Sequence, residues 1–286
     1  MGKPPTRHKR ALELIDSPML RSWAELHNGL RVVELLLKPG ASSGIGRATA
    51  ILFAKNGWQV ILTGRNEANL REAVQECVQT GSKSTDVASV VGDITSTDVQ
   101  EQLVKTATSK FGRLDCLVNN AGFAVPSQKF EEADISNFDK VFATNVRSVI
   151  QLTKLAIPHI IKTKGTIINI SSVVALVSIP SAGFYSMSKS ALDQFTKILS
   201  LEMAPHGVRV NSVNPAVIKT QFLNNMGATQ EQADAYRETA KKQHALGRVG
   251  DADEVAKSIF WLAGPDSSFT TGQLLKVDGG YVLMRP

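Results

Sequence analysis

Cysteine is scarce in this chain of 286 residues, which contains only Cys77 and Cys116. Two cysteines at this separation do not form a disulfide framework, and they lack the close spacing of a zinc site. The 5 histidines also lack ligand spacing, so we expect no metal ion. The composition fits a reducing, intracellular compartment, and we expect a cytoplasmic protein. Mitochondrial targeting is the less favoured alternative, because acidic residues interrupt the basic stretch near the start of the chain.

Long apolar runs are also missing, since no stretch reaches the roughly 18 residues that span a bilayer. The net charge is +6, but much of it comes from the first ten residues, and no basic run interleaved with aromatic residues follows. We therefore expect neither a membrane span nor a nucleic-acid partner. The hydrophobic fraction of 43% and the charged fraction of 20% are ordinary for a globular protein. The length fits one α/β domain with an ample core.

From residue 41 onward, short apolar segments alternate with longer amphipathic ones. Strands are expected at 60–63, 89–91, 114–118, 166–170, 208–213 and 274–277. Helices are expected at 44–56, 66–80, 96–110, 136–162, 184–203 and 251–263. Strands that alternate with helices require right-handed crossovers and a parallel sheet. The fold class is therefore α/β, with a Rossmann-type, doubly wound sheet of seven parallel strands and helices on both faces.

The first strand of this sheet is harder to place. Residues 32–37, with the sequence VVELLL, are the only candidate upstream. A central parallel strand is buried on both faces, and Glu34 would put a charge there. We expect the strand to form with Glu34 near its outer end or paired with a cation. Residues 1–28 show no clear pattern, so we expect an atypical extension in front of a single domain at 29–286.

A glycine-rich turn, GASSGIG at residues 40–46, opens the first helix. Ligands of a doubly wound sheet bind at the carboxyl ends of its strands, where this turn lies. Glycines let the backbone approach a pyrophosphate, and the helix N-terminus favours its charge. Glycine-rich turns also occur in loops that bind nothing, so this evidence is weak by itself.

Arg65 follows the second strand and bears on the choice of dinucleotide. Proteins that bind NAD usually carry a carboxylate at this strand end for the ribose 2′-hydroxyl. Here the position is Gly64, with a guanidinium next to it that suits a 2′-phosphate. A solvated loop arginine is the alternative. The sequence thus favours NADP(H) over NAD(H).

Tyr185 and Lys189 are four residues apart in a segment expected to be helical, which puts them on one face. A free phenol has a pKa near 10. A nearby ammonium favours the phenolate and lowers this pKa, which gives a proton donor and acceptor of useful strength. Surface helices also place these residue types together by chance. Ser172, however, lies 13 residues before the tyrosine, at the end of an apolar run.

Together these features resemble the short-chain dehydrogenase/reductase family, in its single-domain branch. The resemblance covers about residues 40–282. The segments 246–248 (LGR) and 277–281 (VDGGY) are most similar to the 3-oxoacyl-[acyl-carrier-protein] reductase-like subgroup. Two residues depart from the family pattern: Pro39 stands where threonine is usual, and Ala216 replaces a glycine beside the nicotinamide site.

The resemblance implies hydride transfer between NADP(H) and a ketone or secondary alcohol. Tyr185 would protonate the developing alkoxide, Ser172 would donate a hydrogen bond to the same oxygen, and Lys189 would lower the tyrosine pKa and bind the nicotinamide ribose. Asn145 would hold a water in a proton relay toward the lysine, with an exposed structural asparagine as the alternative. The implied cofactor-binding residues are Gly40, Ser42, Ser43, Gly44, Ile45, Gly46, Arg65, Asp93, Ile94, Asn120, Tyr185, Lys189, Ile218 and Thr220.

The expected partner is a small-molecule ketone or alcohol, for which a 3-oxoacyl group is one option and sugars, steroids and retinoids remain open. Residues 221–246 are expected to form a substrate lid at the carboxyl edge of the sheet. The resemblance also implies a homo-oligomer, namely a tetramer. A second hypothesis is a non-catalytic protein with an impaired nucleotide-binding half, suggested by Glu34, by Pro39 and by the abrupt change of pattern at Ala41.

Overall fold

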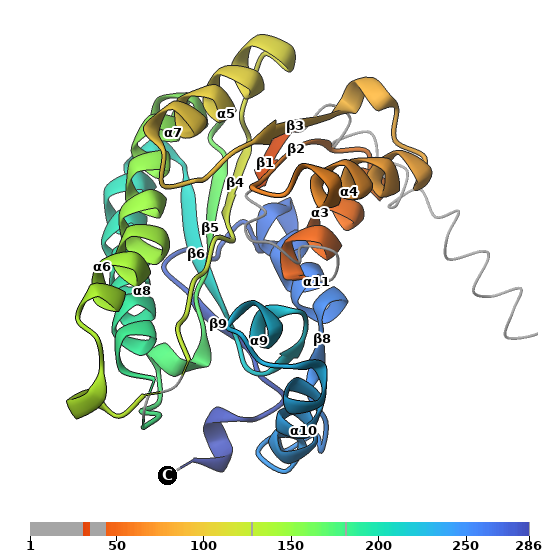
Figure 1. Ribbon diagram of the computed structural model, residues 1–286. Helices are drawn as coiled ribbons and strands as arrows, with labels where there is room; N and C mark the ends of the chain where they lie inside the picture. Colours follow the sequence, from red (N-terminus) through yellow and green to blue (C-terminus); the bar gives the residue numbers. More distant parts are fainter. Residues whose placement is uncertain (1–30, 35–43, 127, 181, 286) are drawn as a thin grey trace, which may run out of the picture.

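Figure 1 shows the computed structural model, which describes residues 31–34, 44–126, 128–180 and 182–285. Within these ranges, parallel strands form one seven-stranded sheet in the order β3-β2-β1-β4-β5-β6-β9. They are β1 (Arg31–Glu34), β2 (Gln59–Gly64), β3 (Val87–Val91), β4 (Cys116–Asn119), β5 (Thr166–Ile170), β6 (Arg209–Pro215) and β9 (Leu274–Val277). A second, two-stranded sheet pairs β7 (Ile218–Lys219) with β8 (Gly250–Asp251). The predicted doubly wound parallel α/β fold is confirmed.

The helices connect these strands and cover the sheet. They are α3 (Ile45–Lys55), α4 (Glu67–Gln79), α5 (Thr97–Lys110), α6 (Ser136–Phe142), α7 (Ser148–Thr163), α8 (Gly183–Met203), α9 (Phe222–Asn225), α10 (Gln230–Lys241) and α11 (Ala252–Ala263). Short 3₁₀ turns lie at Ser84–Asp86, Phe130–Glu132, Val173–Ala175, Ala204–His206, Pro265–Ser267 and Val282–Met284. None of the helices in the described ranges is both long and apolar enough to cross a membrane.

The core has two parts, one on each face of the sheet (Figure 1). One apolar cluster joins α3, α4 and α11 to the strands, and the other joins α5, α7 and α8 to them. In β2, Val60 and Leu62 belong to the first cluster and Ile61 to the second. Successive side chains of a strand point to opposite faces, so a strand covered on both sides is apolar at every position. This is why the strands read as short apolar runs in the sequence.

β1 takes the central place that the first strand requires. It pairs with β2 on one side and β4 on the other, and Glu34 is its last residue, beside Val118. The order of the strands reverses between β1 and β4, so a ligand-binding crevice is expected at the carboxyl ends of these two strands. The predicted continuation of the strand to residue 37, the extension at 1–28, and Gly40, Ser42 and Ser43 lie outside the described residues.

The single helix expected at 136–162 is interrupted. Between α6 and α7, residues Ala143–Arg147 form a π-helical turn. A π-turn inserts an extra residue between two helical stretches whose apolar spacing is otherwise normal, so hydrophobic periodicity does not reveal it. The wide turn contains Asn145, whose side chain is completely buried.

Candidate active site

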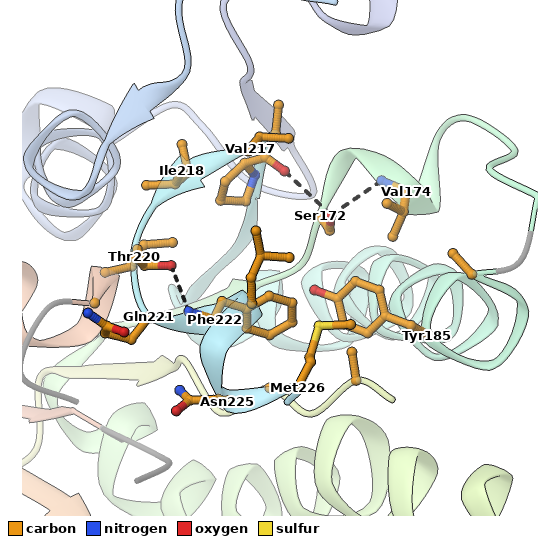
Figure 2. Close-up of a pocket in the computed structure, with 18 of the residues that line it drawn as sticks. Ser172, Val174, Tyr185, Val217, Ile218, Thr220, Gln221, Phe222, Asn225 and Met226 are labelled. Atoms are coloured by element: carbon orange, nitrogen blue, oxygen red, sulfur yellow. Dashed lines mark hydrogen bonds between the residues drawn. The ribbon is translucent and has the colours of Figure 1, made fainter. Parts of the chain in front are cut away.

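A cavity of about 790 Å³ lies at the carboxyl ends of β4, β5 and β6. Its wall is formed by the start of α3, Asn120 after β4, the residues after β5, one face of α8, and the chain from Pro215 to Ala228. Figure 2 shows three of these segments around one space: the residues after β5 with Ser172, the helix with Tyr185, and the chain from Val217 to Met226. They meet because parallel strands bring all their carboxyl ends to the same edge of a sheet.

Tyr185 projects into this cavity from the first turn of α8 (Figure 2). Its ring lies beside that of Phe222, with 5.8 Å between the ring centroids. Burial of the phenol among the cavity walls raises its pKa to about 12, and a hydrogen bond with the Ser172 hydroxyl acts in the opposite direction. The sequence argument expects a lowered pKa, because it considers the neighbouring ammonium without the loss of water. In this geometry the loss of water dominates, and the phenol holds its proton at neutral pH.

Lys189 lies one helical turn further along α8 and is only 2% exposed. Its Nζ atom lies 5.7 Å from the centroid of the Tyr185 ring and donates a hydrogen bond to the Ile170 carbonyl at 2.7 Å. Burial lowers the pKa of Lys189 to about 8, although the charge of Asp193 opposes this shift. The side chain is therefore a buried cation at neutral pH that faces the cavity.

Two neighbouring serines follow β5, and the structure separates their environments. The Ser172 hydroxyl borders the cavity, lies 3.4 Å from the Pro215 carbonyl oxygen and accepts a hydrogen bond from the Val174 backbone at 3.3 Å. Ser171 instead donates to the backbone carbonyl of Lys189 at 3.2 Å. Because successive residues of an extended chain point in opposite directions, only Ser172 is directed toward the Tyr185 hydroxyl.

Asn145 connects the π-turn to two walls of the site. Its amide nitrogen donates to the Phe123 carbonyl at 2.8 Å and to the Ser188 hydroxyl at 2.9 Å, and its oxygen accepts from the Phe123 backbone at 2.6 Å. Both amide protons are therefore used within the protein, while the oxygen retains one lone pair for a water. Asn145 is not the exposed structural asparagine that was the alternative.

The start of α3 forms another part of the cavity wall, with Gly44, Ile45 and Gly46. Gly44 caps the helix without a side-chain hydrogen bond, and the first turn contains no acidic residue. A Cβ atom on Gly44 would meet none of the described residues within 4 Å, so on their side the backbone is open to a ligand. Free backbone N–H groups at the positive end of a helix suit an anion, so these residues fit the pyrophosphate of a dinucleotide.

The other predicted cofactor residues fall into two groups. Asn120, Ile218 and Thr220 line the cavity. Arg65 and Asp93, at the ends of β2 and β3, pair with each other at 3.7 Å between a guanidinium nitrogen and a carboxylate oxygen. Both side chains are close to half exposed and are not among the residues that line the cavity. Ile94 also does not line the cavity: it is 1% exposed within the second core cluster, and its carbonyl accepts a hydrogen bond from Gln100 at 2.6 Å.

Comparison with known proteins gives a consistent result. Residues 40–282 match the family described as Enoyl-(Acyl carrier protein) reductase. The chain is 36% identical over 253 residues to the 3-oxoacyl-[acyl-carrier-protein] reductase of Thermotoga maritima, covering 87% of this chain and 98% of that protein. It belongs to the short-chain dehydrogenase/reductase family.

Other members of this family differ in their named substrates. The L-fucose dehydrogenase of Mus musculus is 36% identical over 247 residues, covering 86% of this chain and 88% of that protein. A crystal structure of a short-chain dehydrogenase/reductase of unknown function from Caenorhabditis elegans, solved with cofactor, superposes with a TM-score of 0.85. It is 36% identical and covers 90% of this chain and 96% of that chain. Membership therefore establishes a dehydrogenase or reductase, without a substrate.

Sequence reasoning missed part of the apolar wall of the cavity. These residues come from loops and short turns, where no hydrophobic periodicity marks them. They include Val125, Val174, Ile179 and Tyr281. It also missed Asp193 and Asn214, which lie behind the cavity. The available signal was a carboxylate four residues after Lys189, on a face of α8 that is otherwise buried.

Proposed function

We propose that the protein is an NADP(H)-dependent oxidoreductase that interconverts an uncharged, largely apolar ketone and its secondary alcohol. The observation that carries this proposal is the convergence of Ser172, Tyr185 and Lys189 on one cavity that also contains the uncapped start of α3. The central position of β1 between β2 and β4 supports this function over the non-catalytic alternative.

In the reductive direction, the proton comes from Tyr185. Its hydroxyl donates to the carbonyl oxygen of the substrate as negative charge grows there, while Ser172 stabilises the same charge by a hydrogen bond. When bound, the nicotinamide supplies the hydride. Lys189 presents its cation to this corner and would hold the nicotinamide ribose. Asn145 fixes the wall at Phe123 and, through the remaining lone pair of its oxygen, would hold a water that restores the proton.

The cofactor would lie along the carboxyl edge of the sheet. Gly44, Ile45 and Gly46 would hold the pyrophosphate, together with the loop residues Gly40, Ser42 and Ser43. Asp93 and Ile94 would adjoin the adenine, and Asn120, Ile218 and Thr220 the nicotinamide half. Arg65 would bind the 2′-phosphate, and this role distinguishes NADP(H) from NAD(H). The ion pair between Arg65 and Asp93 is long and exposed, so it holds the guanidinium only weakly. Arg65 therefore stays available to a 2′-phosphate.

Replacing Arg65 by alanine should weaken NADPH binding by about 10–100-fold, which corresponds to the loss of one charge-assisted contact. NADH lacks the 2′-phosphate, so its dissociation constant should stay nearly the same. Both constants are measured by quenching of protein fluorescence at low ionic strength, and added salt should narrow the difference.

A matched control for this experiment is Arg71→Ala. Arg71 is exposed on α4 and pairs with Glu67, so its loss removes the same charge without touching the strand ends. It should leave both constants unchanged. Equal affinity of the unmodified protein for NADPH and NADH at low salt would remove Arg65 from the cofactor site.

The walls of the cavity support the substrate class. Among the described residues that line it, Lys189 alone carries a charge. Aliphatic and aromatic side chains dominate the region around Tyr185, where Phe222 is in ring contact. A buried apolar surface rejects hydroxyl-rich ligands, because their polar groups lose water without gaining partners. An aliphatic, aromatic or 3-oxoacyl ketone therefore fits better than a monosaccharide.

The experiment that tests this function follows absorbance at 340 nm in both directions: NADPH oxidation with a panel of neutral ketones and a 3-oxoacyl thioester, and NADP⁺ reduction with secondary alcohols and monosaccharides. Turnover of apolar ketones is the expected result. Turnover of L-fucose alone would contradict the substrate class but not the chemistry. Absence of NADPH binding in a fluorescence titration would instead favour the non-catalytic protein.

Three further features belong to the proposal. Residues 29–286 would act as one domain, and residues 221–246, which contain α9 and α10, would cover the substrate as a lid. A hydrogen bond from Arg237 to the Thr220 carbonyl, at 2.6 Å, ties α10 to the start of this segment. A homotetramer in the cytoplasm is proposed from family resemblance, and sedimentation tests the oligomeric state.

A further inference from the structure

Asp193 is a buried carboxylate that the proposed chemistry does not use. It lies on α8, one helical turn after Lys189, and is 4% exposed. Residues four apart on a helix have neighbouring side chains. A carboxylate in the interior is costly unless other groups bond to it or balance its charge, so its partners identify what it does.

Hydrogen bonds connect Asp193 to the strand ends that carry the site. Asn214 donates through Nδ2 to Asp193 Oδ2 at 2.8 Å and to the backbone carbonyl of Ser172 at 3.1 Å. Ser212 Oγ lies 3.3 Å from Asp193 Oδ1 and donates to Asn214 Oδ1 at 2.6 Å. The Ser171 hydroxyl also bonds to the carboxylate. This cluster ties α8 to the carboxyl ends of β5 and β6.

The electrostatic surroundings of Lys189 are simple. In the part of the chain that the structure describes, the titratable groups that face it are Tyr185 and Asp193, both on α8. The opposite wall presents the Ile170 carbonyl and the neutral segment around Gly122. Among the residues whose side chains the structure describes, Asp193 is the carboxylate whose charge acts on the lysine, and it opposes the effect of burial on the lysine pKa.

We propose that Asp193 is a positioning residue for this site: its carboxylate keeps the buried Lys189 ammonium charged at neutral pH, and through Asn214 it holds the strand end that carries Ser172. The effect of Asp193 on the charge of Lys189 is a property of the protein without cofactor or substrate. The catalytic consequence rests on the proposed function, because it requires a charged Lys189 beside Tyr185.

Asp193→Asn separates the charge from the hydrogen bonds. The amide oxygen of the new residue accepts from Asn214 Nδ2, and its nitrogen donates to the free lone pair of Ser212 Oγ, whose proton goes to Asn214 Oδ1. The variant therefore keeps the bonds to Asn214 and Ser212 and loses the negative charge. A merely structural role predicts little change, whereas the electrostatic role predicts a shift along the pH axis.

The first measurement uses the cofactor-free protein and follows its free energy of unfolding from pH 6 to 10. Lys189 has a pKa of about 8 in the folded protein against an ordinary value of 10.5. The unfolded chain therefore binds more protons between these values, and stability rises with pH across this window. Subtracting the same titration of Lys189→Met isolates this contribution. The same subtraction is made for Asp193→Asn with the double variant Asp193→Asn/Lys189→Met. The rise in stability that remains should begin at least about one pH unit lower than in the protein with Asp193.

The second measurement is the pH profile of turnover. Loss of the Lys189 charge should end activity on the alkaline side, so Asp193→Asn should move this limb to lower pH by at least about one unit. Activity should then recover as the pH is lowered. Ser212→Ala, which removes a neutral hydroxyl and keeps the carboxylate with its Asn214 donor, should shift neither measurement. Asp193→Ser, a smaller neutral replacement, serves if the asparagine variant does not fold.

The outcomes distinguish this inference from the proposed function. A shifted unfolding titration in a protein without detectable turnover supports the role of Asp193 and rejects the proposed activity. Unshifted unfolding and activity profiles in Asp193→Asn show that the carboxylate is neutral or only structural, and they overturn the inference.

Discussion

Tyr185→Phe should slow ketone reduction by about 10²–10⁴-fold, the usual contribution of a positioned proton donor. The substitution keeps the ring, and with it the contact with Phe222, and removes only the hydroxyl that is hydrogen-bonded with Ser172. Binding of NADPH should change little, because the other implied cofactor contacts, including that of Lys189, are kept. The rate is measured at saturating NADPH, and binding by fluorescence.

Tyr236→Phe provides the matched control. Tyr236 also lines the cavity, but it comes from α10 and is 45% exposed, so removal of its hydroxyl should leave the rate within a few-fold. If Tyr185→Phe kept most of the activity on a verified substrate, another group would be the acid.

The protonation state of Tyr185 should affect the two directions of the reaction differently. Because burial raises the pKa of Tyr185 to about 12, the phenol keeps its proton from pH 6 to 9. Reduction should then not lose its acid within this range. Alcohol oxidation needs the phenolate, whose fraction grows with pH, so its rate should rise until loss of the Lys189 charge limits it.

Prediction of the fold succeeded because most of the sheet is covered on both faces. Strands such as β5, with all five residues buried, leave a short apolar run between polar turns. The starts of two helices could also be predicted from the sequence. In the structure, Asn66 accepts a hydrogen bond from the Asn69 backbone, and Asp251 forms a capping box with Glu254. These signals are local, and neighbours in the sequence suffice to produce them.

Properties that depend on several distant segments could not be predicted in the same way. The helix spacing of Tyr185 and Lys189 indicates their proximity, but the pKa of the phenol depends on how completely the walls exclude water. Those walls include Phe222 of α9 and Val174 of the turn after β5, which are far apart in the sequence. The expected direction of the pKa shift was therefore wrong, although the expected juxtaposition of the side chains is present.

The cofactor half shows the same limit. Arg65 and Asp93 each follow a predicted strand, which placed both residues at the carboxyl edge of the sheet. Their side chains do meet there. Their contact with each other was not foreseen, because it depends on the register between β2 and β3, which brings Gly64 opposite Val91. The choice of nicotinamide cofactor therefore stays a prediction that only binding measurements can test.

Ser172→Ala should reduce turnover by about 10²–10³-fold, the range found when one hydrogen-bond donor to a developing oxyanion is removed. The Michaelis constant should change less than kcat, because the bond strengthens as charge develops on the substrate oxygen. The hydroxyl also bonds to Tyr185, so its loss should leave the pKa of that phenol higher still.

Ser171→Ala tests whether the position of the hydroxyl, and not the loss of a serine, causes this effect. Ser171 is also buried, is adjacent to Ser172 in the chain and lines the same cavity, but its hydroxyl bonds to the Lys189 backbone and to Asp193 and has no bond to Tyr185 among the described residues. We expect its replacement to lower the melting temperature by a few degrees, because it removes a buried hydrogen bond, and to leave most of the turnover. If Ser171→Ala lost as much turnover as Ser172→Ala at equal stability, the opposite directions of the two serine side chains after β5 would not distinguish a catalytic hydroxyl from a structural one. The donor to the substrate oxygen would then have to be sought elsewhere in the cavity.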